Sequence, residues 1–80
     1  MKAKIYIKYK DGILDPQGTV TKSALNSLGI NNIKSMTIGK FIEIDFKGLK
    51  KEDAKKVTDE SCEKLLVNPN TETYKYEIED

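Results

Sequence analysis

The sequence predicts an α+β fold in which a four-stranded antiparallel sheet carries two helices on one face, in the order strand, helix, strand, strand, helix, strand. Apolar and polar residues alternate with period two over 2–10, 33–46 and 73–79, which is typical of half-buried strands. Between these runs, apolar residues recur at helical spacing over 15–28 and 51–66. The chain has 80 residues, so we expect a single domain over its whole length (residues 1–80) with a thin core.

The first strand places its apolar side chains on one face and four of its lysines on the other. The apolar face holds Ala3, Ile5, Ile7 and Tyr9. We interpret the lysine face as solvated. Lysines at such positions can also protect an edge strand from aggregation, or form a basic patch, and the pattern leaves both alternatives open.

The loop and helix that follow carry clear boundary signals. Asp11-Gly12 is a turn dipeptide, because glycine accepts positive φ without steric cost. Asp15 is a good helix N-cap and Pro16 suits the first helical position, while Gly29 follows the last apolar residue as a C-terminal cap. The loop also carries Ile13 and Leu14, which we expect either to anchor it to the body of the protein or to contact a partner.

The segment 33–46 predicts the middle pair of strands. Met36, Ile38, Ile42, Ile44 and Phe46 share one parity and are all apolar. A three-residue loop, Gly39-Lys40-Phe41, would pair these residues on one face of a hairpin, which is the reading we favour. A single long strand bent at Gly39 is the alternative.

The second helix is predicted over 51–66, and a turn over 67–70 leads into the last strand. The inner side of this helix is expected to hold Ala54, Val57, Ser61 and Leu65, with the neighbouring Cys62 and Leu66. We interpret Cys62 as a small buried hydrophobe. A nucleophilic cysteine normally needs an activating base, and the chain contains no histidine.

The composition excludes several classes of function. The net charge is +1 and the chain has no arginine, which disfavours sequence-specific binding of nucleic acid. One cysteine and no histidine rule out a disulfide within the chain and argue against a zinc site. No apolar segment is long enough for a signal peptide or a membrane span, so we expect a cytoplasmic protein. We find no catalytic constellation; Gly39-Lys40 could touch a phosphate, but a hairpin tip explains it as well.

Four short motifs, in this order and spacing, resemble the PurS family, the small subunit of phosphoribosylformylglycinamidine synthase in purine biosynthesis. They are Asp11–Gly18 followed by Ala24-Leu25, then Leu28-Gly29, Ile38-Gly39-Lys40 and Leu65–Pro69. The resemblance covers nearly the whole chain. It departs from the family pattern at Asn70–Thr73, where apolar residues and an acidic pair usually follow, and this leaves the partner surface near that turn open.

The resemblance implies a non-catalytic assembly subunit of a glutamine-dependent, ATP-dependent C–N ligase complex. Such a subunit would bridge the synthetase large subunit and the glutaminase subunit, support ammonia transfer, and self-associate as a dimer or tetramer. It would bind no cofactor itself, since ATP and glutamine belong to the other subunits. The candidate partner contacts are Asp15, Gln17, Gly18 and Lys40. The alternative from another class is a free-standing ligand-binding or regulatory module.

Overall fold

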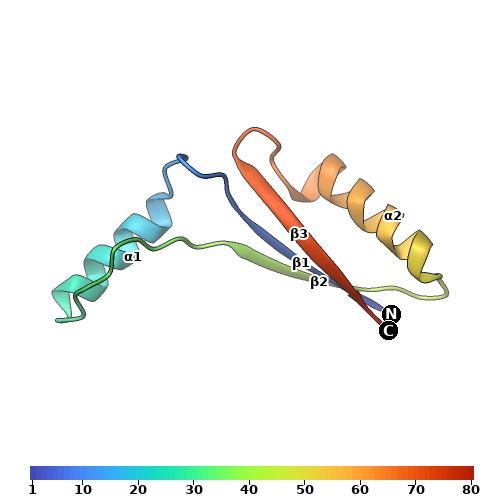
Figure 1. Cartoon of the computed structure of the whole chain (residues 1–80), viewed down its shortest axis with the longest axis horizontal. Coiled ribbons are helices and arrows are strands. Elements are labelled where there is room, and N and C mark those ends of the chain that lie inside the picture. Colours follow the sequence, from blue (N-terminus) through green and yellow to red (C-terminus); the bar gives the residue numbers. More distant parts are fainter.

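The computed structural model covers residues 1–80 and contains three strands, two α-helices and one π-helical turn. In chain order the elements are β1 (Lys2–Tyr9), α1 (Pro16–Ser27), β2 (Lys40–Asp45), α2 (Lys51–Ser61), the π-helical turn η1 (Cys62–Leu66) and β3 (Glu72–Glu79). The two termini lie next to each other at one end of the sheet (Figure 1).

The sheet is antiparallel throughout and has the strand order β2-β1-β3. Ile5 of β1 lies opposite Ile42 of β2 on one side and Tyr76 of β3 on the other. The first strand of the chain is therefore the central strand of the sheet. Its lysines do not protect an edge, which removes one of the two alternatives that the sequence left open for them.

The core lies between one face of the sheet and α2, as the alternation in the strands predicts. Ala3, Ile5 and Ile7 of β1 are buried against it. Ala54 and Thr58 of α2 and Cys62 of the following turn η1 recur every fourth residue and are completely buried. The predicted inner side of this helix was thus only partly right: Val57 and Leu65 are exposed, and Thr58 takes an inner position by donating its hydroxyl to the Ala54 carbonyl oxygen at 2.7 Å.

Two tyrosines and one aspartate fasten α2 to the edge strand β3. The hydroxyl of Tyr74 donates to Asp59 Oδ1 at 3.1 Å, and that of Tyr76 donates to Asp59 Oδ2 at 2.9 Å. Partial burial and these hydrogen bonds raise the pKa of Tyr74 to about 12 and that of Tyr76 in the same direction. Nothing in the spacing of residues along the chain indicates that Asp59 is the partner of both tyrosines.

The prediction of a fourth strand and of a hairpin at Gly39-Lys40-Phe41 is wrong. Residues 31–39 run in an extended path without pairing to any strand, and β2 begins only at Lys40. The side chain of Asp15 accepts a hydrogen bond from the backbone N–H of Ile38 at 2.7 Å, so this segment follows α1 instead of folding back on β2. The alternating pattern over 33–46 was read correctly as extended chain, but only its second half joins the sheet.

The prediction that both helices lie on one face of the sheet is also wrong. Only α2 covers the sheet, whereas α1 and the extended segment project away from it (Figure 1). We call residues 13–39 the arm. The principal extents of the molecule are 50 × 26 × 15 Å. Its radius of gyration is 16.1 Å, while a compact domain of this length has about 12 Å. The chain therefore consists of a packed body and a long arm.

Candidate functional site

The point where the arm leaves the body brings together two of the four residues that the sequence singled out. Gln17, in the first turn of α1, and Lys40, the first residue of β2, line one hollow of about 50 Å³. We call this hollow the arm root. Its remaining walls come from the end of β1, the start of β3 and the chain just before β2: Ile7, Lys8, Tyr9, Ile38, Gly39 and Glu72. A hollow of this size can hold a water or one small polar group of a partner.

Asp15 does not line this hollow, and its side chain is used within the chain itself. It is 7% exposed and caps α1 by accepting a hydrogen bond from the N–H of Gly18 at 2.9 Å. Its second oxygen accepts the N–H of Ile38. These backbone donors hold the pKa of Asp15 below its usual range. Asp15 thus acts as a clamp between α1 and the extended segment, and a contact with a partner stays a prediction.

Gly18 is required by the same clamp. A Cβ at this position would overlap the carbonyl oxygen of Met36 and lie 2.8 Å from Asp15 Oδ2. A glycine in the first turn of a helix can be explained by close approach of a partner backbone or by simple tolerance near a helix end. The backbone that approaches it is the chain's own extended segment, so the structure adds a third explanation.

Lys40 forms an ion pair that spans the central strand. Its Nζ lies 3.4 Å from Oε2 of Glu72 on β3, and Glu72 also accepts the backbone N–H of Asn68 at 2.8 Å through Oε1. Glu72 belongs to the stretch Asn70–Thr73, where the sequence departs from the family pattern. Sequence reasoning missed this residue, because nothing in the order of residues indicates that Lys40 and Glu72 flank the same strand.

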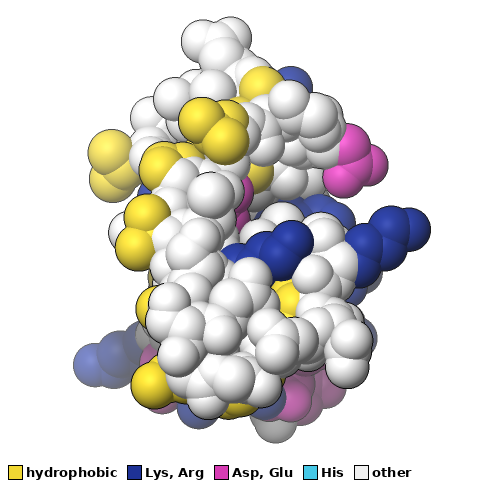
Figure 2. Space-filling view, turned by 90° about the vertical axis from the view of Figure 1, so that its left-hand side faces the viewer, with side chains coloured by type: hydrophobic (Ala, Val, Ile, Leu, Met, Phe, Trp, Pro, Cys, Tyr) yellow, Lys and Arg dark blue, Asp and Glu magenta, His cyan; other side chains and the backbone are white.

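Apolar side chains project from the arm into solvent. Leu14 is 75% exposed and Leu28 is 76% exposed, and Ile13, Val20 and Ile30 are exposed as well. Figure 2, which looks onto the arm end of the molecule, shows hydrophobic side chains gathered along one side. The prediction that Leu14 anchors the loop is therefore not supported, because most of its side chain is exposed to solvent and does not pack against the body. Exposed apolar residues clustered in this way are typical of an interaction surface.

The remaining chemistry-bearing groups form no reactive arrangement. No group of three or more His, Cys, Asp or Glu side chains is placed to hold a metal ion. Cys62 is completely buried, and this burial raises the pKa of its thiol, which opposes formation of the nucleophilic thiolate. None of the helices has the length and apolar character needed to cross a membrane.

Comparison with known proteins gives full-length matches. A family described as PurS, phosphoribosylformylglycinamidine (FGAM) synthase, matches residues 2–80. The PurS subunit of this synthase from Methanocaldococcus jannaschii is 41% identical over 78 residues, covering 98% of this chain and 94% of that protein. The crystal structure of PurS from Bacillus subtilis superimposes with a TM-score of 0.88 at 38% identity, over 99% of this chain and 98% of the other.

A solved complex is also among the similar structures. One chain of the structure named PurLQS from Thermotoga maritima has a TM-score of 0.85 to this chain at 30% identity. The match covers 95% of this chain and 93% of the other. The similarity thus extends over the arm as well as the body.

Proposed function

The chain belongs to the PurS family, and from this premise we propose that it bridges the synthetase and glutaminase subunits of phosphoribosylformylglycinamidine synthase and supports the transfer of ammonia between them. It is a subunit of this ligase complex in purine biosynthesis, and alone it is not the catalytic one. The observation that carries the bridging proposal is the arm, an apolar projection that the body of the same chain leaves uncovered.

The exposed area of the isolated chain supports an assembly role. A compact protein of 9.1 kDa exposes about 4,900 Å², whereas this chain exposes 6081 Å². The excess of roughly 1,200 Å² exceeds the ~800 Å² that each partner contributes to an interface of standard size. A single chain therefore has enough uncovered surface for at least one stable interface beyond what a compact monomer needs.

We assign one such interface to a second copy of the chain, so that the protein is at least a dimer. The three-stranded sheet carries one helix on its inner face, and Ile42 and Ile44 of the edge strand β2 remain only partly buried there. Val20 of α1 and Leu28, which caps the end of this helix, are exposed to solvent. Reciprocal burial of the two arms would cover these side chains, with a gain of about 25 cal/mol for each Å² of apolar surface removed from water.

The bridging contacts are assigned to the arm root. Gln17 and Lys40 offer an amide and an ammonium group side by side, and the side chain of Lys40 is 61% exposed in spite of its ion pair. Such groups suit hydrogen bonds to a loop or carboxylate of a partner. Asp15 and Gly18 support this surface by fixing the first turn of α1. The chain itself would bind neither ATP nor glutamine, and it would work in the cytoplasm with its partners.

Co-elution tests this proposal directly. The chain is mixed with the synthetase and glutaminase subunits of the same organism and passed over a size-exclusion column. Co-elution of all three supports the bridging role; a complex of only the other two, with this chain eluting separately, contradicts it. Synthase or glutaminase turnover by this chain alone would contradict its assignment as the non-catalytic subunit.

A further inference from the structure

The face of the sheet opposite α2 is divided into two electrostatic regions. At the end near the termini, lysines and carboxylates neutralise one another. Lys2 Nζ lies 3.4 Å from Glu43 Oε2, and Lys4 Nζ lies 2.9 Å from Glu79 Oε1. The hydroxyl of Tyr6 donates to Glu77 Oε1 at 3.0 Å. Glu43, Glu77 and Glu79 on this half of the face are thus already paired with the chain's own lysines and tyrosine, and Asp45 lies beside them opposite Lys2.

The other end of the face carries two lysines that have no carboxylate partner. Lys8 on β1 and Lys75 on β3 form no ion pair, although the sheet register places them diagonally on neighbouring strands. Residues in this diagonal relation have Cα atoms about 7–8 Å apart. Two positive charges on neighbouring strands with no carboxylate partner repel each other, and because β1 is the central strand, edge protection does not explain Lys8.

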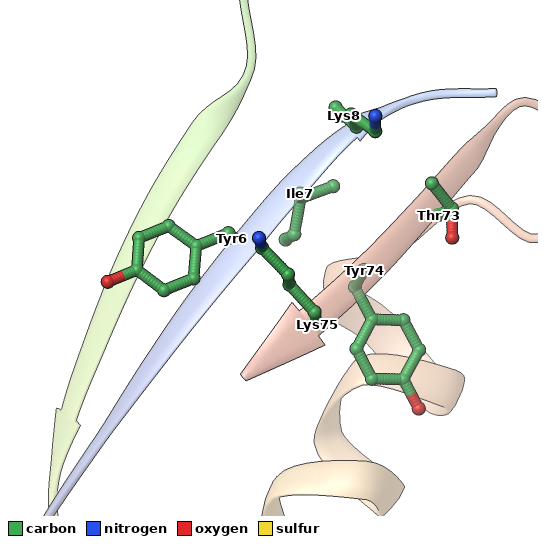
Figure 3. Close-up of a pocket in the computed structure, with 6 residues that line it drawn as sticks. All are labelled: Tyr6, Ile7, Lys8, Thr73, Tyr74 and Lys75. Carbon is green, nitrogen blue, oxygen red and sulfur yellow. The ribbon is translucent and has the colours of Figure 1, made fainter. Parts of the chain in front are cut away.

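These lysines border a hollow of about 250 Å³ on the sheet (Figure 3). Thr73, opposite Lys8 in the register, adds a hydroxyl, and Tyr6 borders the hollow as well. Ile7 and Tyr74 also border it, but their side chains lie on the face that α2 covers. Lys75 Nζ lies 5.8 Å from the centre of the Tyr6 ring, a cation–π contact that holds its stem over the sheet. Phe41 packs against the same tyrosine with ring centres 5.1 Å apart, and this contact restricts the movement of the Tyr6 ring. The ring that orients Lys75 is therefore itself fixed.

We propose that this hollow binds a small phosphate-bearing anion. A phosphate monoester carries a charge between about −1.5 and −2 near neutral pH and has three acceptor oxygens. Two ammonium groups and one hydroxyl match that charge and that number of acceptors. A carboxylate carries a single charge and would leave one of the two lysines uncompensated. The proposal stands on the open face of the sheet alone and does not depend on the assembly role assigned to the arm.

The test uses the full-length protein in its natural oligomeric state. Amide chemical shifts are followed by NMR while inorganic phosphate is added at constant ionic strength, and Lys8→Gln and Lys75→Gln are compared with Lys4→Gln. Lys4 lies on the same strand and face and its replacement removes the same charge, but its partner is Glu79. We expect saturable shifts around Tyr6–Lys8 and Thr73–Lys75, and each of the first two variants should weaken binding roughly tenfold, Lys4→Gln less than about twofold.

Two results would overturn the proposal. One is the absence of saturable shifts at these residues up to ~50 mM phosphate, because a dissociation constant above this concentration is weaker than typical specific binding. The other is equal weakening in all three variants, which would mean general electrostatic attraction. A second titration with AMP separates the sources: tighter binding than inorganic phosphate, with the same dependence on Lys8 and Lys75, identifies an organic monoester as the ligand. Equal or weaker binding with that dependence identifies the free ion.

Discussion

Gln17 and Lys40 line the same hollow at the arm root, although one begins a helix and the other begins a strand. They meet because the Asp15 carboxylate holds the first turn of α1 against the extended segment that leads into β2. The clamp stabilises this part of the fold, and we propose that the two side chains beside it, Gln17 and Lys40, contact a partner. The predictions below separate these two roles.

Replacing Gln17 and Lys40 together by alanine should weaken assembly and leave the fold intact. The Lys40 side chain is 61% exposed, and Glu72, which is 11% exposed, keeps its hydrogen bond from the Asn68 N–H, so we expect loss of the ion pair to cost about 0.5 kcal/mol. We expect the melting temperature of the isolated chain to stay within about 3 °C of wild type. Binding to the partner subunits, measured by titration calorimetry, should fall at least about tenfold.

A matched control keeps this result specific. Asn26 and Lys47 are exposed and distant from the arm root, so Asn26→Ala with Lys47→Ala removes one amide and one ammonium group elsewhere. This variant should bind like wild type. If it loses as much affinity as the first pair, or if the first pair binds normally, the bridging surface does not include the arm root.

The arm should drive self-association through its apolar side chains. Val20→Gln with Leu28→Gln keeps good helix formers in the arm but removes two exposed apolar groups. We expect wild type to sediment as a dimer or larger at ~50 µM, and the variant to shift toward monomer. Asn26→Gln is the control and should sediment like wild type. A wild-type protein that is monomeric at this concentration would refute the self-association proposal.

The Asp15 clamp should give stability that depends on acid. Its pKa is lowered in the folded chain, so its contribution is present above the ordinary carboxyl pKa of about 4 and is lost as pH falls through the lower folded value. Asp15→Asn should melt about 5 °C lower than wild type at pH 7, because the amide has one acceptor oxygen and cannot accept from both Gly18 and Ile38. Melting curves at several pH values should show the two proteins converging below pH ~4. A constant difference across this range would show that ionisation of Asp15 plays no part.

The hydrogen bonds from Tyr74 and Tyr76 to Asp59 should affect an alkaline titration of the tyrosines. The pKa of Tyr74 is raised to about 12, so the stability contributed by its neutral form is present below about pH 10 and is lost as pH rises through 12. Absorbance near 295 nm should therefore show a fraction of the four tyrosines ionising late. In Asp59→Asn this late fraction should move toward the ordinary tyrosine pKa. An unchanged titration curve would mean that burial alone, without Asp59, sets the shift.

The local signals in the sequence were reliable wherever neighbouring residues decide the outcome. Asp15 caps α1, Pro16 starts it, and Gly12 and Gly29 adopt positive φ. The alternation in β1 correctly identified Ala3, Ile5 and Ile7 as core residues. These features depend on backbone conformation and on the period of the side chains, both of which can be read within a short window.

The arrangement of the elements could not be read in the same way. The alternation over 33–46 indicates extended chain, but it does not say whether another strand lies beside it. Met36 and Ile38 have the pattern of a buried strand and yet belong to the arm, where they pair with no strand and are only partly buried. The ion pair of Lys40 with Glu72 could not be predicted from the sequence for a related reason. It depends on β1 lying in the centre of the sheet, between the strands that carry the two residues.

Reconstitution of the synthase with two nitrogen sources tests the bridging role most directly. The synthetase and glutaminase subunits are assayed with and without this chain, once with glutamine and once with ammonium chloride. A subunit that only joins the other two and supports ammonia transfer should be needed for the glutamine-dependent rate and not for the ammonia-dependent rate. We predict that omitting the chain abolishes the first and leaves the second within about twofold, because free ammonia bypasses the glutaminase. A glutamine-dependent rate that is unchanged without the chain would contradict the account.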